Sequence, residues 1–337
     1  MLQIMVMSII RSRVILGVIL LVLLACLPKT AFLAQGTNNL GIVVTFPLMI
    51  KDIEAILCEG DEVSSIVPLG VDPHEYQLTF RDAEILAKAN IVVSTAHTPF
   101  EARIKELILS GEINTKLIEI PNIPGILILK NPSTNVSNYH GILFHGYNYI
   151  IFLKYLRDIL STFKPECANV YYHRVENLIN RIESIEHSKP LKGFKAVIDT
   201  PVIQYLVTWL GANVTYILAV EHDVPVVPQD IDKVEEILKL YKQEAIVVIT
   251  EDSSALNLLS ELAFKYSVKI LVIPNPIMTT QSILTYLENI TKECQNLLTL
   301  KPNEGKTLSF NLEITVLIFV IVVSVLVAVL FIQRVRK

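Results

Sequence analysis

The chain has 337 residues, 52% of them hydrophobic, and its 29 Lys and Arg against 33 Asp and Glu give a formal net charge of −4. The basic residues are scattered rather than gathered in a stripe, which excludes the electrostatic footprint of a nucleic-acid-binding protein. The high hydrophobicity comes partly from two apolar segments at the ends of the chain, so it does not indicate a polytopic membrane protein.

The N-terminal segment has the layout of a secretory signal, which we assign to residues 1–34. Arg11 and Arg13 precede an uncharged apolar run, Val14–Leu27, that is too short to span a bilayer comfortably. A lipobox at Leu23–Cys26 is an alternative for this end of the chain. We favour the signal, because a second apolar segment near the C-terminus already provides an anchor.

Short β-branched runs alternate with helical segments between the two ends, a pattern that predicts parallel sheets with crossover helices. We expect a helix entering at Pro47 and ending before Gly60, another capped by Thr79, and a third from about Asn148 to Phe163. The expected strands are Ile42–Thr45, Val63–Val67, Ile91–Thr95 and Leu117–Ile120 in the first half, and Ala196–Ile198, Val214–Leu218, Ile246–Thr250 and Ile270–Ile273 in the second.

One long amphipathic helix is expected between the two groups of strands. The apolar positions Tyr171, Val175, Leu178 and Ile182 step by four and three, which is the stripe of a helix. We interpret this helix as a rigid spine that joins two α/β lobes; the alternative is a helix packed on one lobe only.

The C-terminal segment Ile314–Ile332 is an unbroken apolar stretch, about 28 Å long as a helix, and predicts a membrane span. Glu313 precedes it and basic residues follow it, so the positive-inside rule places the tail in the cytoplasm and the main body outside the cell. The chain therefore divides into a signal (1–34), a first α/β lobe (40–164), a spine helix (165–190), a second α/β lobe (191–296), a linker (297–313), a transmembrane anchor (314–332) and a cytoplasmic tail (333–337).

Three cysteines remain after removal of the signal: Cys58, Cys167 and Cys294. They lack the spacing of a metal knuckle, and an odd number allows at most one internal disulfide. The sequence does not choose the pair.

Side chains that can bind a metal follow several of the predicted strands. In an open parallel sheet, ligands bind beyond the carboxyl ends of the strands. A cleft between the lobes would bring such side chains together, with imidazole and carboxylate ligands suited to a divalent transition metal. The candidate metal ligands are His74, His97 and His140 from the first lobe and Asp199 and Glu251 from the second.

Other interpretations of these residues stay open. His145 lies near His140 and could replace it, although a structural role suits it better, and His97 is as well explained by a structural role as by metal binding. Asp199 and Glu251 each precede a segment where a helix could begin, so both could be helix caps.

The sequence VPLGVDPHEYQLTF at Val67–Phe80 resembles the signature of the ZnuA and TroA group, the zinc- and manganese-type solute-binding proteins of ABC importers, whose pattern is close to VPPGxDPHxYxPT. The resemblance extends over most of the region between the two apolar ends. It implies two α/β lobes joined by a long helix, an ABC permease as partner, a monomer and no catalytic activity. The further matching segments are Arg81–Thr95, Asn138–Ala168, Ala196–Val214, Val226–Asp230 and Ala245–Pro276.

The resemblance also implies four metal ligands. The first falls on His74, and the second falls on His140 by its spacing to Asn148. The third and fourth, a His or Glu and an acid in the family pattern, fall on Thr200 and Asn275, neither of which binds such a metal strongly. We expect His97, Asp199 or Glu251 to compensate.

Our leading hypothesis is therefore a membrane-tethered, extracellular receptor that captures a divalent transition metal, Zn²⁺ or Mn²⁺, for an ABC importer. Its lobes are expected to move little, because one long helix resists hinge opening. The alternatives are a related receptor with altered or lost metal specificity, and a metallohydrolase in which Glu251 would be the general base.

Overall fold

The computed structural model describes residues 39–219 and 226–299. The predicted signal, anchor and cytoplasmic tail lie outside these residues. Within the described part of the chain, no helix is both long enough and apolar enough to cross a bilayer.

The described residues contain two four-stranded parallel sheets, and each of the eight predicted strands is found within one to two residues of its expected bounds. The first sheet has the order β2-β1-β3-β4 and the second the order β6-β5-β7-β8, so the same topology occurs twice. In both sheets the chain moves to one side of its first strand and then crosses to the other, which creates a topological switch point. The strands are β1 (Gly41–Val44), β2 (Glu62–Ser65), β3 (Ile91–Ser94), β4 (Lys116–Glu119), β5 (Lys195–Ile198), β6 (Asn213–Ile217), β7 (Ala245–Thr250) and β8 (Lys269–Ile273).

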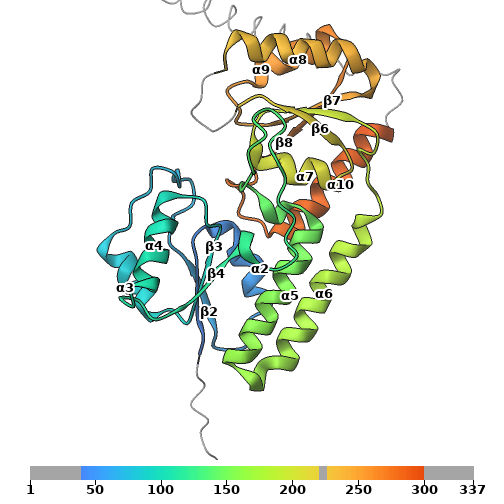
Figure 1. The fold of residues 1–337 in the computed structure, drawn as a ribbon. Coiled ribbons are helices and arrows are strands. Elements are labelled where there is room, and N and C mark those ends of the chain that lie inside the picture. The colour runs from blue at the N-terminus through green and yellow to red at the C-terminus, as the bar shows by residue number, and fades with distance from the viewer. Residues whose placement is uncertain (1–38, 220–225, 300–337) are drawn as a thin grey trace, which may run out of the picture. The chain divides into compact units, whose positions relative to one another are not determined.

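Helices flank both sheets (Figure 1). The helix cap predicted at Thr79 is confirmed as part of a capping box, since the Thr79 hydroxyl accepts from the Asp82 amide while the Asp82 carboxylate accepts from the Thr79 amide. The helix predicted from Pro47 to Gly60 is shorter than expected and begins with a 3₁₀ turn. The α-helices are α2 (Ile50–Glu54), α3 (Phe80–Lys88), α4 (Pro99–Leu109), α5 (Gly146–Phe163), α6 (Ala168–Glu186), α7 (Gln204–Trp209), α8 (Pro228–Tyr241), α9 (Leu256–Lys265) and α10 (Ile283–Thr299).

The two longest helices of the described residues, α6 and α5, lie side by side (Figure 1). The predicted apolar stripe of α6 is buried at Tyr171, Val175, Leu178 and Ile182. The last helix, α10, extends through Thr299, three residues into the stretch expected to be a linker, because Leu297 packs against the hydrophobic core.

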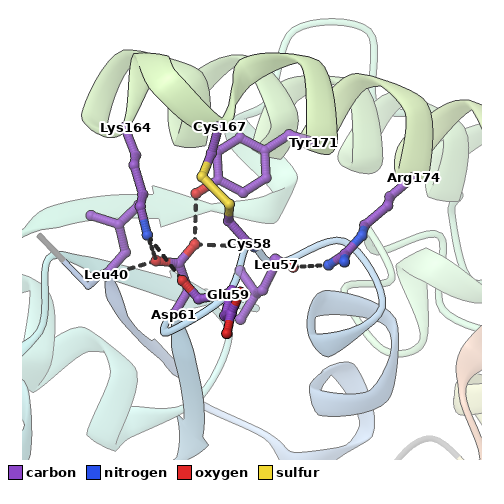
Figure 2. Close-up of a disulfide and its surroundings, with 9 residues drawn as sticks. All are labelled: Leu40, Leu57, Cys58, Glu59, Asp61, Lys164, Cys167, Tyr171 and Arg174. Atoms are coloured by element: carbon purple, nitrogen blue, oxygen red, sulfur yellow. Dashed lines mark hydrogen bonds and ion pairs between the residues drawn. A yellow bond between two sulfur atoms is a disulfide. The ribbon is translucent and has the colours of Figure 1, made fainter. Parts of the chain in front are cut away.

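Cys58 and Cys167 form a disulfide, and Cys294 is a buried free thiol. Figure 2 shows that the bridge joins the turn after α2 to the start of α6. Beside it, the Asp61 carboxylate accepts from Lys164 Nζ at 2.8 Å and from the Tyr171 hydroxyl at 2.6 Å. A disulfide and a buried ion pair therefore fix the start of α6 to the loop between α2 and β2.

Four fully buried tyrosines tie distant segments together through their hydroxyls, because a buried phenol needs a hydrogen-bond acceptor. Each ring fills the core while its O–H reaches a carboxylate or a backbone carbonyl. The donor and acceptor pairs are Tyr149 to Asp52, Tyr171 to Asp61, Tyr205 to the carbonyl of Asn138, and Tyr286 to the carbonyl of Pro274.

Candidate metal centre

Three histidines meet at the carboxyl edge of the first sheet. His74 follows β2, His97 follows β3, and His140 lies in the segment that leads to α5. One ring nitrogen of each lies within 4.8 Å of the other two, and the ring centroids are 4.7–5.6 Å apart. Nitrogens on one tetrahedral zinc ion lie about 3.4 Å apart, so the three imidazoles are close to the spacing that a shared ion requires.

His74 is the exposed member of the group. The Asp72 carboxylate accepts from its backbone N–H at 2.8 Å, an Asx turn that fixes the Asp-Pro-His segment. Farther along the loop, the Tyr76 hydroxyl donates to Asp82 at 2.8 Å and so anchors the loop to the start of α3. The motif that stands out in the sequence thus presents its histidine from a loop held at both ends.

His97 is positioned by the buried carboxylate of Glu101 in the first turn of α4. Glu101 accepts from the backbone N–H of His97 at 3.0 Å and from the Thr95 hydroxyl at 2.9 Å, while that hydroxyl lies 2.8 Å from His97 Nδ1. Burial works to raise the pKa of Glu101, but the nearby imidazole of His97 and hydrogen bonds that include those from the His97 amide and the Ser94 hydroxyl lower it below its ordinary value. Glu101 is therefore an anion beside Nδ1 of His97, and the ring of Phe46 stacks on the ring of His97.

His140 is oriented by Asn138, two residues earlier. The side-chain oxygen of Asn138 lies 2.9 Å from the backbone nitrogen of His140 and 3.1 Å from its Nδ1. This contact favours the tautomer with the proton on Nδ1 and the lone pair on Nε2. Burial, together with the neighbouring imidazoles of His97 and His74, lowers the pKa of His140 to about 3, so the ring is neutral at ordinary pH.

The segment carrying His140 also contacts the turn and the helix α7 that follow β5 of the second sheet. The Asn138 amide donates at 2.8 Å to the Pro201 carbonyl and at 2.8 Å to the Gln204 side chain. Gly141 has a φ of 68°, and a Cβ at this position would lie 2.1 Å from the carbonyl oxygen of Val202. Only glycine fits this close approach between the two backbone segments.

Asp199 and Glu251 do not belong to the histidine group. Among the described residues, the one cluster of three or more metal-binding side chains holds the three histidines alone. Asp199 is buried at the end of β5, where its carboxylate accepts from the amide and the hydroxyl of Thr250 and so links the ends of β5 and β7. Burial raises its pKa. Glu251 is exposed at the end of β7.

The positions that the family resemblance gives to the third and fourth ligands are engaged in local hydrogen bonds. Thr200 caps a short 3₁₀ helix by accepting from the Val202 amide. The Asn275 side chain donates to Asp252 at 2.8 Å and accepts from the Ile277 amide at 3.1 Å. These two residues therefore support turns at the edge of the second sheet.

Two supporting residues, Asn138 and Glu101, were missed by the sequence reasoning. The signals were local: an Asn two residues before a His can form an Asx turn, and Thr98 followed by Glu101 is a capping box. His145, the alternative to His140, has a buried Nδ1 without a hydrogen bond, and burial followed by the charge of Lys189 lowers its pKa to about 4.

Comparison with known proteins points to the same family as the motif at Val67–Phe80. Residues 42–300 match the family described as zinc-uptake complex component A periplasmic, ZnuA. The iron ABC transporter substrate-binding lipoprotein MtsA of Streptococcus pyogenes serotype M1 is 22% identical over 252 residues, which cover 71% of this chain and 81% of MtsA.

Two solved structures share the fold. FpvC of Pseudomonas aeruginosa in complex with Mn²⁺ has a TM-score of 0.61 and 18% identity, over 77% of this chain and 97% of FpvC. The periplasmic zinc binding protein TroA from Treponema pallidum has a TM-score of 0.61 and 14% identity, over 77% of this chain and 99% of TroA.

Proposed function

Because this chain belongs to the ZnuA family of metal-binding, ABC-transporter substrate-binding proteins, we propose that it captures a divalent transition-metal ion of the zinc or manganese class and delivers it to an ABC permease. The observation that carries this proposal is the convergence of the ring nitrogens of His74, His97 and His140 within 4.8 Å. The ion is the cargo of the protein.

The chemistry of the three side chains supports metal capture. Imidazole is a good ligand for zinc, nickel, copper and iron ions, and it binds as the neutral ring. His140 is neutral at ordinary pH, so no proton has to be displaced from it before an ion binds. Asn138 behind His140 and Thr95 behind His97 contact the Nδ1 atoms, the arrangement that orients metal-bound histidines.

The relatives differ in the ion that their names state. MtsA is described as an iron transporter's binding protein, FpvC was solved with Mn²⁺, and TroA is described as a zinc-binding protein. These names support a divalent transition metal as cargo, and the three imidazole donors found among the described residues suit zinc within that class.

The second part of the proposal concerns location and architecture. We infer from the charged flanks of the apolar segment 314–332 that the chain is anchored in the cell membrane, with residues 40–296 outside the cell. The relative MtsA is described as a lipoprotein, which is also a tethered form. The lobes 40–164 and 191–296, joined by the helix at 165–190, would then present the captured ion to the permease.

One alternative function has a specific observation behind it. Thr200 and Asn275 occupy the positions of two family ligands, so a receptor of the same fold with altered or lost metal specificity is the second candidate. The metallohydrolase interpretation needs Glu251 beside the ion, but Glu251 is exposed and outside the histidine group. The family consists of solute-binding proteins.

Metal titration of the purified, metal-stripped full chain tests the proposal. Calorimetry and thermal unfolding with Zn²⁺ and Mn²⁺ should show saturable binding and a raised unfolding temperature. His74→Ala and His140→Ala should each weaken binding by at least about 100-fold, because each removes one of three ligands. His173→Ala, on the exposed side of α6, is the matched control. Absence of binding by the native chain, or unchanged affinity in both variants, would refute metal capture at this site.

A further inference from the structure

The side-chain amide of Asn138 is buried, and both of its ends are engaged. Its oxygen accepts from the backbone N–H of His140 at 2.9 Å and lies 3.1 Å from the ring atom Nδ1, while its NH₂ group donates to the Pro201 carbonyl and the Gln204 side chain, each at 2.8 Å. A backbone N–H only donates and a backbone carbonyl only accepts, so the oxygen and the nitrogen of this amide cannot exchange places. The ring of His140 must therefore donate from Nδ1, which leaves the lone pair on Nε2.

Gln204, the first residue of α7, is the next link behind Asn138. Its side chain is buried, and its Nε2 group donates at 2.7 Å to the backbone carbonyl of Lys130. Because that carbonyl only accepts, the other end of the amide, Oε1, is the atom that faces Asn138. Two amides thus form a relay of hydrogen bonds from the Lys130 carbonyl to the imidazole of His140, and each amide has one orientation only.

Tyr205, the next residue of α7, fixes the backbone of the same segment. Its ring is fully buried, and its hydroxyl donates to the carbonyl of Asn138 at 2.6 Å and accepts from the N–H of Leu129 at 2.9 Å. The Pro201 carbonyl comes from the 3₁₀ turn that Thr200 caps. Three hydrogen bonds on Asn138 therefore come from the turn and the helix that follow β5.

We propose that Gln204 and Tyr205 are positioning residues for metal capture, which set the orientation and the tautomer of His140 through Asn138. An imidazole binds an ion only through a ring nitrogen whose lone pair is aimed at the ion, so a ring in the other tautomer, or turned away, is lost as a ligand. The second sheet then contributes to the affinity for the ion through hydrogen bonds from the segment after its strand β5. This inference rests on the proposed function, since it concerns one of the same three histidines.

A double-mutant cycle tests whether Gln204 acts through Asn138. Gln204→Leu keeps most of the side-chain volume, removes both hydrogen bonds of the amide, and should weaken Zn²⁺ binding by the metal-stripped full chain about tenfold in calorimetric titration. The double variant Asn138→Ala with Gln204→Leu should bind Zn²⁺ within about twofold of Asn138→Ala alone, because the relay is already broken. Native affinity in Gln204→Leu, or losses that multiply in the double variant, would overturn the inference and leave metal capture intact.

Tyr205→Phe is a second variant, which keeps the buried ring and removes only the hydroxyl. We expect a loss of Zn²⁺ affinity of about tenfold here too. Tyr286→Phe is the matched control, because its hydroxyl also lies in the core and donates to a backbone carbonyl, that of Pro274. The control should lose a similar amount of stability in urea and keep native Zn²⁺ affinity. Equal losses of Zn²⁺ affinity in the two variants would overturn the role of Tyr205.

The tautomer of His140 gives a readout that needs no metal. In the metal-free full chain with ¹⁵N-labelled histidine, long-range ¹H–¹⁵N correlation spectra distinguish the protonated ring nitrogen from the one with the lone pair, and His140→Gln identifies the signals. We expect the proton on Nδ1 in the native chain and a mixture of tautomers in Gln204→Leu. A proton on Nε2 in the native chain, or an unchanged single tautomer in Gln204→Leu, would overturn the inference. Failure of the native chain to bind Zn²⁺ or Mn²⁺ would instead overturn the proposed function, while these spectra would still decide the relay.

Discussion

The carboxylate of Asp52 in α2 accepts a hydrogen bond of 2.7 Å from the backbone N–H of Ile283, which lies 231 residues later at the start of α10. The Leu284 amide and the Tyr149 hydroxyl donate to the same carboxylate. The first turn of α10 is therefore capped by a residue of the first sheet's flanking helix, and the positive end of the helix dipole faces a buried acid. This contact joins α10, the last helix of the described residues, to α2, the first.

Asp52→Ala should destabilise the protein by about 2–4 kcal/mol at pH 7, because it leaves buried amides and the Tyr149 hydroxyl without their acceptor. Urea unfolding monitored by circular dichroism measures the change. Glu54→Ala, an exposed acid on the same helix, is the control and should cost well under about 1 kcal/mol. Equal effects of the two substitutions would show that the Asp52 contact contributes nothing to stability.

Asn138→Ala should weaken metal binding by about 10–100-fold while leaving the three histidines in place, because His140 loses the contact that sets its tautomer and orientation. Calorimetric titration with Zn²⁺ gives the affinity. Asn131→Ala removes another buried asparagine of the same segment, one whose side chain accepts from the Ser133 amide instead. Wild-type affinity in the Asn138 variant would contradict a supporting role for this residue.

Gly141→Ala should cost at least about 2 kcal/mol and also weaken metal binding. A residue with a Cβ is strained in the left-handed conformation of Gly141, and the new methyl group must also displace the Val202 carbonyl. This displacement should shift the neighbouring His140. Gly193 is the matched control, since its φ is 93° but nothing lies within 4 Å of an added Cβ. Gly193→Ala should therefore cost about 1 kcal/mol and leave metal affinity unchanged. Equal losses in the two variants would mean that the contact with Val202 is unimportant.

Removal of the disulfide by the pair of substitutions Cys58→Ala and Cys167→Ala should lower stability by about 3–4 kcal/mol, because the bridge closes a loop of more than a hundred residues in the unfolded chain. Thermal unfolding with and without a reductant measures the loss. The reductant should bring the native protein to the midpoint of the double variant and leave the variant unchanged. A native midpoint that does not respond to complete reduction would be the contrary result.

Because of His145, the free energy of unfolding of the metal-free protein should fall as the pH is lowered. The folded pKa of His145, about 4, lies below the unfolded value of 6.5, so the unfolded chain takes up the proton first. The stability it contributes is complete above pH 6.5 and is lost as the pH falls towards 4, by on the order of 2 kcal/mol.

The contribution of His145 to the free energy of unfolding has to be measured by comparing variants, because Asp52 also titrates in this pH range. Burial raises the pKa of Asp52 to about 6, which acts in the opposite direction over part of the same range, since that contribution is lost as the pH rises. His145→Gln should flatten the rise in unfolding free energy between pH 4 and 6.5 relative to the native chain. His173→Gln, on an exposed face, should leave the profile unaltered. Parallel profiles for the native chain and the His145 variant would disprove the role of this residue.

The local part of the architecture was predictable from the sequence. Strands such as Ile91–Ser94 and Ala245–Thr250 are short β-branched runs between helical segments, a pattern that favours buried parallel strands. The capping box at Thr79 and the stripe of α6 are also decided within a few residues. The motif around His74 identified the loop that presents one of the three histidines.

The tertiary structure alone decided which distant groups meet. His97 joins His74 and His140, whereas Asp199 bonds to Thr250 and Glu251 stays in solvent. Cys58 pairs with Cys167 rather than with Cys294. Periodicity and capping are local properties that the order of residues encodes directly. The orientation of side chains and the pairing of distant residues depend instead on how whole strands and helices pack. This packing sums many small contributions over the entire chain.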